Sequence, residues 1–339
     1  MNKPLDYKYT GKKLENQSLP DSNANIRGQK QYPYLPDENL VKAVNLALYL
    51  QRPLLLQGEP GCGKTLLARA IAREFKETFK IKDKEYPYFP WYIKSTTQAK
   101  EGLYIYDAIG RLRDAQLVAT VSNQAEKAKI SKRCENPEAY ITWGALGNAF
   151  REETYRPIIL IDEIDKADID FPNDLLRELD EGTFTITETQ TEIPTKQQPI
   201  VIITSNSEKE LPDAFLRRCI FYYLDFPEKD RLIDIVNAHF DDSLDMELVT
   251  AAVEKFIGLR ETGASRRDGK KASTSELLDL ISSLKHYAAK EINAELTTEE
   301  ISPDDIIKKA LAIIKNLGDN LPLLGTLLKT KDDQDYYKK

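Results

Sequence analysis

One octapeptide restricts the folds open to this chain more than any other feature: Gly58-Glu59-Pro60-Gly61-Cys62-Gly63-Lys64-Thr65. It follows a short apolar run at 53–57 and precedes a helical pattern at 64–80. The pattern G-x-x-x-x-G-K-[ST] between a buried strand and a helix is typical of a phosphate-binding loop. Its glycines let consecutive backbone N–H groups face phosphate oxygens at the positive end of the helix. The motif therefore predicts an α/β fold that binds a nucleotide.

Two side chains of this loop have expected chemical roles. Lys64 reaches the β- and γ-phosphates, and the hydroxyl of Thr65 is a magnesium ligand. Cys62 is interpreted as a small residue that fills the loop, with a redox role for a thiol at a helix N-terminus as the alternative. The expected nucleotide-binding residues are Gly58, Glu59, Pro60, Gly61, Cys62, Gly63, Lys64, Thr65 and Leu66.

Polar residues follow two later apolar runs. Asp162 and Glu163 end the run 157–161. A carboxylate at the carboxyl end of a strand, beside a phosphate loop, is suited to hold Mg²⁺ together with Thr65. Glu163 is then placed to polarise a water for attack on the γ-phosphate. Asn206 follows the run 200–204 and is expected to orient the same water.

Arg217 and Arg218 follow a short helical segment that begins at Pro212, and they precede the last apolar run. A pair of arginines is ordinarily a solvated face or a partner for carboxylates. The alternative is an arginine finger, which stabilises charge on the transferring phosphoryl group from a neighbouring subunit. We therefore predict a catalytic set of Glu163, Asn206 and Arg218, with Arg217 as the second candidate for the finger.

Composition excludes several classes of protein. The 339 residues, 41% of them hydrophobic, are enough for a sizeable core and about two domains. Three cysteines and two histidines, widely spaced, argue against a disulfide scaffold or a structural zinc site. The formal charge of -7 argues against binding nucleic acid by bulk charge. The first residues carry no secretory signal and no run is apolar enough to span a membrane, so we expect a cytoplasmic protein.

The pattern of the chain changes near residue 226. Before that point apolar runs alternate with helical patterns, as in a parallel sheet covered by helices; after Pro227 only helical patterns follow. The expected strands lie at 53–57, 88–94, 157–161, 200–203 and 220–224. The expected regions are a mobile polar arm at 1–30, an α/β domain at 31–226, a helical domain at 227–330 and a polar tail at 331–339.

Two segments interrupt the α/β pattern. The first, at about 99–140, is an insertion in which a helix is expected at 108–129, with a second helix following at 137–152. The second, at 182–196, alternates and is rich in threonine, which predicts an exposed β-hairpin.

With these motifs in this order, the chain resembles AAA+ ATPases, and among them the MoxR group, over about residues 30–290. The phosphate loop at 58–65 is similar to Walker A, residues 159–166 to Walker B, 204–206 to sensor 1, and 211–218 to an arginine-finger segment that favours Arg218. The resemblance implies an AAA+ P-loop NTPase domain, with a parallel five-stranded sheet flanked by helices, and a small C-terminal α-helical lid domain. The insertion and the hairpin are similar to the helix-2 and pre-sensor-1 insertions of that group.

What the resemblance implies for function is ATP binding and hydrolysis with Mg²⁺ in a hexameric ring, in which Arg218 completes the site of the neighbouring subunit. Hydrolysis would move the two insertions against a protein client, which is a remodelling or chaperone activity. A partner with a von Willebrand factor A domain is also implied. One departure is that the stretch 271–276 lacks the arginine that the group carries there as sensor 2; Lys270, Lys271, Arg266 and Arg267 are the nearby cations.

Three alternatives compete with the remodelling ATPase. A slow, ATP-gated scaffold or sensor in a bacterial signalling or defence assembly is favoured by the missing sensor-2 arginine. A nucleic-acid motor is suggested only by the basic cluster at 127–133, which is more typical of a solvated helix face. A GTPase is disfavoured, because the nearest match to a guanine-recognition motif, Asp165-Lys166-Ala167-Asp168, begins with the wrong residue and lies in the Walker B turn.

Overall fold

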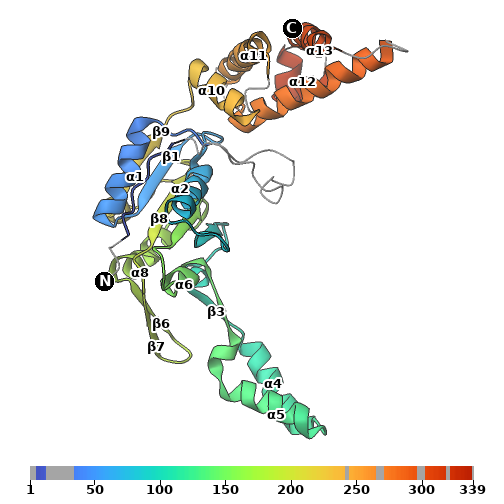
Figure 1. Ribbon diagram of the computed structural model, residues 1–339. Helices are drawn as coiled ribbons and strands as arrows, with labels where there is room; N and C mark the ends of the chain where they lie inside the picture. The colour runs from blue at the N-terminus through green and yellow to red at the C-terminus, as the bar shows by residue number, and fades with distance from the viewer. Residues whose placement is uncertain are drawn as a thin grey trace. The chain divides into compact units, whose positions relative to one another are not determined.

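The computed structural model describes residues 5–12, 34–240, 244–264, 271–295, 302–317 and 321–337. Within these ranges the backbone groups into two units. The first unit consists of residues 5–12, 36–58 and 64–224, and the second of residues 34–35, 59–63 and the described residues from 225 onward. Figure 1 labels the helices and strands along the chain. No helix in the described ranges is long and apolar enough to cross a membrane.

A parallel sheet of five strands is the centre of the first unit, with the order β2-β5-β8-β1-β9. Figure 1 labels β1, β8 and β9 of this sheet. Its strands are β1 (Leu54–Gly58), β2 (Tyr88–Tyr92), β5 (Ile158–Asp162), β8 (Ile200–Ser205) and β9 (Ile220–Leu224). In register, Leu160 of β5 and Leu54 of β1 both pair with Ile202 of β8. The inner strands β5 and β8 are buried throughout, because helices cover both faces of the sheet. The predicted parallel sheet is confirmed.

The strand order determines where a ligand can bind. From β1 the chain crosses to β2 at the far edge and returns through β5 and β8, which lies beside β1. Ligands of open α/β sheets bind outside the carboxyl ends of the strands, where the strand order reverses. The segments that follow β1, β5 and β8 meet at that end.

Helices of the first unit flank the sheet. They are α1 (Glu38–Leu50), α2 (Lys64–Thr78), α6 (Ala145–Phe150), α7 (Phe171–Asp174), α8 (Leu176–Glu181) and α9 (Asp213–Leu216). Helix α1 begins at its N-cap Asp37, whose side chain accepts a hydrogen bond from Leu40 N at 2.8 Å. Its inward face is apolar at helical spacing: Leu40, Val44, Ala47 and Leu48 are buried.

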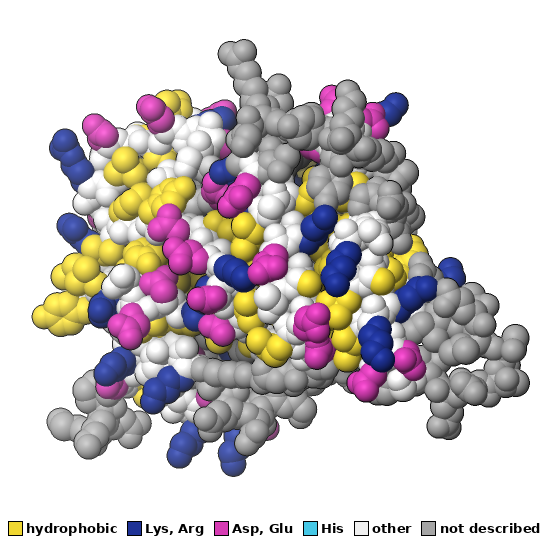
Figure 2. All heavy atoms as spheres, turned by 90° about the horizontal axis from the view of Figure 1, so that it is seen from above, with side chains coloured by type: hydrophobic (Ala, Val, Ile, Leu, Met, Phe, Trp, Pro, Cys, Tyr) yellow, Lys and Arg dark blue, Asp and Glu magenta, His cyan; other side chains and the backbone are white. Residues whose placement is uncertain are grey.

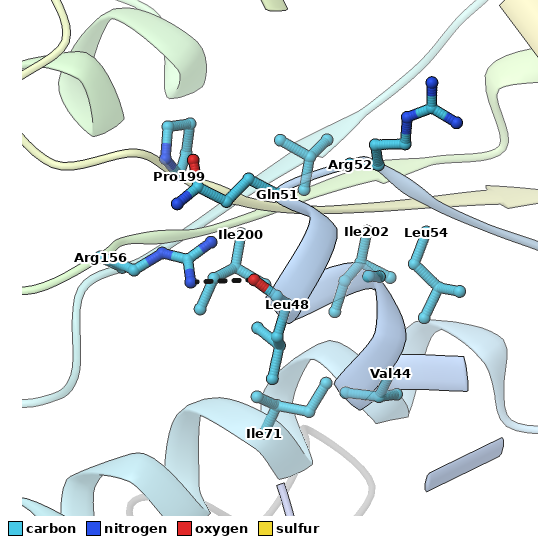
Figure 3. A pocket seen from close by; sticks show the side chains of 12 residues that line it. Val44, Leu48, Gln51, Arg52, Leu54, Ile71, Arg156, Pro199, Ile200 and Ile202 are labelled. Atoms are coloured by element: carbon cyan, nitrogen blue, oxygen red, sulfur yellow. Dashed lines mark hydrogen bonds between the residues drawn. The ribbon is translucent and has the colours of Figure 1, made fainter. Parts of the chain in front are cut away.

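A small hollow lies beside the end of α1 and is lined from α1, β1, α2 and β8 (Figure 3). Its volume of about 10 Å³ has room for no more than one water molecule. The guanidinium of Arg156 donates to the carbonyl of Leu48 at 3.3 Å and to that of Gln198 at 2.9 Å. A cation at the carboxyl end of a helix is electrostatically favourable. The hollow is therefore a packing feature at the end of α1.

The first insertion is a two-stranded ribbon that carries two helices. In order, it consists of α3 (Ala99–Leu103), β3 (Tyr104–Tyr106), α4 (Ala108–Thr120), α5 (Gln124–Glu135), the 3-10 turn η2 (Pro137–Tyr140) and β4 (Ile141–Trp143). Strands β3 and β4 are antiparallel, and α4 and α5 pack on each other beyond them (Figure 1).

The structure corrects the helix boundaries predicted for this insertion. The helix expected at 108–129 is divided, because Asn123 caps a new helix by accepting hydrogen bonds from Ala125 N and Glu126 N. The helix expected at 137–152 is also wrong in its first half. There the residues of β4 pair with β3, and only α6 remains helical.

The second insertion is the expected hairpin, formed by β6 (Thr183–Ile186) and the antiparallel β7 (Thr191–Pro194). Its turn is attached to the root of the first insertion. The Tyr104 hydroxyl donates to Glu188 Oε2 at 2.8 Å and accepts from Thr187 N at 2.9 Å. Lys100 pairs with the other oxygen of Glu188 at 3.1 Å. The hairpin and the first insertion are therefore joined by side-chain contacts.

Residues 5–12 correct the expectation of a mobile polar arm. Tyr9 is 1% exposed, and its backbone N–H donates to Asn45 Oδ1 at 2.9 Å. The backbone N–H groups of Thr10 and Gly11 donate to the two carboxylate oxygens of Glu74 in α2. This stretch is therefore packed against α1 and α2. The other residues of the predicted arm, 1–4 and 13–30, lie outside the described residues.

The second unit has a helical core. Its helices are α10 (Lys229–His239), α11 (Met246–Ala264), α12 (Thr274–Glu295), α13 (Pro303–Lys315), α14 (Leu321–Leu324) and α15 (Lys331–Tyr337). A helical C-terminal region was predicted and is present. Helix α15 lies in the stretch expected to be a polar tail, and Thr330 caps it by accepting from Asp333 N at 3.1 Å.

Figure 2 shows one face of the molecule in space-filling form. On this face acidic and basic side chains lie side by side, with hydrophobic side chains between them.

Candidate active site

The phosphate loop leaves β1 at Gly58 and enters α2 at Lys64. Gly61 and Gly63 have φ of +82° and +92°, which residues with a Cβ rarely adopt. Lys64 is 6% exposed, and its ammonium donates to the Gly58 carbonyl at 2.7 Å. The first turn of α2 contains no acidic residue, so its positive end is not neutralised by its own side chains. A glycine-rich curl at such a helix end suits a phosphate anion.

The carboxylate of Asp162 joins three elements at the carboxyl edge of the sheet. Its Oδ1 accepts a hydrogen bond from the Thr65 hydroxyl at 2.8 Å, from the first turn of α2. The same oxygen accepts from the Thr204 hydroxyl at 2.7 Å, from the end of β8. Asp162 is 8% exposed and Thr204 is 0% exposed. The sequence predicted that Thr65 and Asp162 act together; the part of Thr204 was not predicted.

Glu163 follows Asp162 in a left-handed conformation, with φ 60° and ψ 52°. Such a conformation costs a non-glycine residue about 1 kcal/mol or more and is enriched at functional sites. It is fixed by a hydrogen bond from Glu163 N to Thr204 Oγ1 at 2.8 Å. The side-chain amide of Asn206 donates to Glu163 Oε1 at 3.0 Å. The two predicted residues thus lie in direct contact.

The other carboxylate oxygen of Glu163 is also occupied. The ammonium of Lys166, in the 3-10 turn η3 (Ile164–Lys166), donates to Oε2. This hydrogen bond is the main cause that raises the pKa of Lys166, and the negative charge of Glu163 adds to it. Lys166 was not predicted as a site residue, although its position three residues after Glu163 in a turn is the signal that would have found it.

Asp165 is a second residue that the sequence reasoning missed. It is 2% exposed, and its Oδ2 accepts from Asn206 N at 3.0 Å and from Glu208 N at 2.8 Å. Its Oδ1 is buried without a hydrogen-bond partner among the described residues. Asp165 therefore holds the segment after β8 against the turn after β5.

Arg218 and Arg217 are both exposed at the end of α9. The Arg218 guanidinium donates from Nε to Asp180 Oδ2 at 2.6 Å and from an end nitrogen to the Ala214 carbonyl at 2.9 Å. Its side chain is 44% exposed. Within the described ranges, neither arginine makes a hydrogen bond or ion pair with Glu163 of the same chain.

Loop residues 59–63 group with the second unit. There Glu59 pairs with Arg260 of α11 and with Lys271. Burial alone would raise the pKa of Glu59, but the hydrogen bond from Lys271 and the charges of Arg260 and Lys271 lower it overall. Arg260 also lies over the ring of Phe226, 3.5 Å from its centroid.

The stretch 271–276 also contacts the loop, although it lacks the expected arginine. A Cβ on Gly61 would come within 2.2 Å of the Ser273 side chain, so the two residues pack closely. Cys62 is buried, and its thiol donates to the Glu59 carbonyl at 2.9 Å, as befits a residue that fills the loop. Leu66 is 36% exposed on the first turn of α2. The other candidate cations for sensor 2, Arg266, Arg267 and Lys270, lie outside the described residues.

A parallel sheet with a glycine-rich loop after β1, a lysine and a threonine opening α2, and a carboxylate at the end of β5 defines a P-loop nucleotide-binding protein. A family model described as AAA domain (Cdc48 subfamily) matches residues 52–250, and the chain belongs to this family. It is therefore an AAA+ ATPase.

Among solved structures, the chain is similar to one titled "Crystal structure of FIGL-1 AAA domain in complex with ADP". The two are 17% identical, the match covers 83% of this chain and 82% of that one, and the TM-score is 0.43. No curated protein matches the sequence.

Proposed function

We propose that this AAA+ protein is a magnesium-dependent ATP hydrolase of the MoxR-like group, which assembles into a ring and remodels a protein partner. One observation carries the catalytic part of the proposal. At the carboxyl edge of the sheet, Thr65 and Thr204 both donate to Asp162, while Asn206 donates to Glu163. The proposed metal ligands, Thr65 and Asp162, therefore lie next to the proposed base, Glu163, whose carboxylate is oriented by the amide of Asn206.

The nucleotide is proposed to bind along residues 58–66. The backbone N–H groups of the loop would face the phosphates, and Lys64 would exchange its bond to the Gly58 carbonyl for the β- and γ-phosphate oxygens. Burial of Lys64 favours this exchange, because a charged group in a low-dielectric site interacts strongly with an anion.

The residues at the edge of the sheet fit a magnesium ion. Mg²⁺ prefers one or two carboxylates together with hydroxyl, water and phosphate oxygens. Thr65 Oγ1 and Asp162 Oδ1 supply this donor set 2.8 Å apart, and we assign them as the residues that hold the ion. When bound, Mg²⁺ would neutralise phosphate charge and orient the β- and γ-phosphates. The hydroxyl of Thr204 would keep the Asp162 carboxylate in its orientation.

Hydrolysis is assigned to Glu163 and Asn206. A water oxygen forms a bond to the γ-phosphorus, the bond from that phosphorus to the bridging oxygen breaks, and the proton of the water passes toward the Glu163 carboxylate. Asn206 would orient the water and the carboxylate. Arg218 is assigned to the site of the neighbouring copy, where it would stabilise charge on the phosphoryl group; its exposure supports action outside its own subunit.

The two insertions are proposed as the elements that act on a protein client. The contacts of Glu188 with Tyr104 and Lys100 connect the hairpin turn to the root of the first insertion. Movement of one element would therefore be passed to the other. A partner with a von Willebrand factor A domain is proposed from the resemblance to the MoxR group.

A second candidate function is a slow, ATP-gated scaffold or sensor in a bacterial signalling or defence assembly. The absence of an arginine in the stretch 271–276 favours it. The observation that Glu163 is paired with Lys166 and Asn206 favours slow turnover as well. In this alternative the protein binds ATP tightly, assembles and recruits a partner.

The two candidates are separated by steady-state ATP hydrolysis measured against protein concentration. The remodelling ATPase predicts a specific activity that rises with concentration, requires Mg²⁺ and is lost in Glu163→Gln. Tight ATP binding with negligible turnover in the wild type would favour the scaffold. Failure of the wild type to bind ATP would contradict both.

A further inference from the structure

Both oxygens of the Glu163 carboxylate accept a hydrogen bond from a side chain of the same chain. Oε1 accepts from Asn206 Nδ2 at 3.0 Å, and Oε2 accepts from the ammonium of Lys166. The side chains of Lys166 and Glu163 are 41% and 36% exposed, so their ion pair lies partly in water. The ammonium of Lys166 therefore contacts the carboxylate that is proposed to accept the proton of the attacking water.

The two hydrogen bonds take up acceptor positions that the attacking water needs. The ammonium of Lys166 donates to Oε2 while the amide of Asn206 donates to Oε1, so each oxygen of the Glu163 carboxylate already has a donor where the water would have to donate. As long as the pair persists, Glu163 is a poorer partner for the attacking water.

The rest of the turn does not depend on this ion pair. Glu163 N donates to Thr204, and the buried Asp165 holds the backbone of the segment after β8. An exposed pair of this kind contributes little to stability. Lys166 is therefore free to leave the carboxylate at small cost while the backbone of the site stays in place.

We propose that Lys166 is a positioning residue that restrains hydrolysis through its ion pair with Glu163, and that fast turnover requires the ammonium to leave the carboxylate. This inference rests on the proposed role of Glu163 as the proton acceptor. It assigns to a single lysine a brake on the catalytic step, separate from nucleotide binding.

The test is the steady-state ATPase activity of Lys166→Met, measured over a range of ATP concentrations with Mg²⁺. Loss of the pair is expected to raise kcat by about two- to fivefold, the factor that corresponds to an exposed ion pair. KM for ATP is expected to stay unchanged, because Lys166 acts on the base and not on the nucleotide. Lys166→Gln, which also removes the charge, is expected to give the same rise.

Three further variants make the readout specific. Lys166→Arg keeps the cation and is expected to turn over at the wild-type rate. Lys209→Met is the matched control: Lys209 donates to the carbonyls of Lys166 and Ala167 in the same turn, at 3.2 and 2.7 Å. In the part of the chain that the structure describes, it makes no hydrogen bond or ion pair with Glu163. This variant is expected to leave kcat unchanged. The rise should also disappear in Glu163→Gln/Lys166→Met, since Lys166 acts only through Glu163.

A kcat that is unchanged or lowered in both Lys166→Met and Lys166→Gln would overturn the inference, and so would a rise that persists without Glu163. If the wild type hydrolyses ATP and Glu163→Gln does not, either result removes only the restraint and leaves the proposed function in place. If neither the wild type nor Lys166→Met exceeds the activity of Glu163→Gln, both the proposed function and the restraint are wrong.

Discussion

The hydroxyl of Thr204 donates to Asp162 Oδ1 at 2.7 Å and at the same time accepts a hydrogen bond from Glu163 N at 2.8 Å. One buried hydroxyl at the end of β8 therefore orients the carboxylate assigned to the metal and fixes the backbone of the residue assigned as the base. The carboxyl ends of two neighbouring strands act as one rigid element because this side chain joins them.

Thr204→Val tests this link. Valine has the shape of threonine but leaves the Glu163 N–H without its acceptor and the Asp162 carboxylate without one donor. Because Thr204 is 0% exposed, we expect a loss of about 1–3 kcal/mol in the free energy of unfolding, measured by urea denaturation. ATPase activity should fall further than ATP affinity, and Thr204→Ser, which keeps the hydroxyl, should recover most of both. A Thr204→Val protein with wild-type stability and activity would contradict this role.

Lys64→Ala separates nucleotide binding from folding. The lysine is buried at the start of α2 with its ammonium on the Gly58 carbonyl, and its proposed role is to hold the β- and γ-phosphates. We expect ATP binding, followed by the fluorescence of a labelled nucleotide, to become undetectable at concentrations that saturate the wild type. Circular dichroism should show unchanged helical content. Retained binding would mean that the loop holds phosphate through its backbone alone.

Most residues of the candidate active site could be predicted from the sequence, because their motifs lie at the ends of strands that are themselves predictable. Gly58–Thr65, Asp162 and Asn206 each follow an apolar run that the structure shows as a buried strand. Carboxyl ends of parallel strands meet at one edge, so their proximity was predictable. The positions of Lys166 and Asp165 were not, because each depends on how a short turn after β5 packs against the segment after β8.

The insertion shows where the prediction from sequence fails. The helical pattern at 108–129 continues through residue 123, but the side chain of Asn123 accepts a capping hydrogen bond from Ala125 N, and a new helix begins there. The strand β4 contains only Ile141–Trp143 and depends on pairing with β3. A three-residue strand has no period of its own to detect. Tyr9, similarly, is buried by contacts with residues more than thirty positions away, which no local pattern reveals.

Arg218→Ala tests the proposed site between copies. We expect ATP affinity to stay near the wild-type value and turnover to fall by about 10³-fold, the scale of an arginine finger. A 1:1 mixture of Arg218→Ala with Lys64→Ala should regain activity, because a Lys64→Ala copy can supply Arg218 to an intact nucleotide site next to it. If Arg217→Ala causes the loss and Arg218→Ala does not, the finger is Arg217. If the mixture stays inactive, Arg218 does not act between copies.

The pairing of Glu59 predicts a pH-dependent contribution to stability within the second unit. Its pKa is lowered from 4.5 in the folded protein by Lys271 and Arg260, against the opposing effect of burial. A carboxyl group with a depressed pKa contributes stability that is present above its unfolded pKa and is lost as pH falls through the folded value. Glu59→Gln should therefore lower the urea midpoint at pH 7, and its difference from the wild type should shrink as pH falls below about 4.5.

The matched control for this measurement is Glu254→Gln, which breaks the exposed pair of Glu254 with Lys229 in the same unit. An exposed pair contributes little, so its effect on the urea midpoint should be small at every pH. A Glu59→Gln difference that is equal at pH 7 and below pH 4.5 would show that the charge of Glu59 is not what stabilises the loop. The contact would then act through packing, as the close approach of Gly61 and Ser273 does.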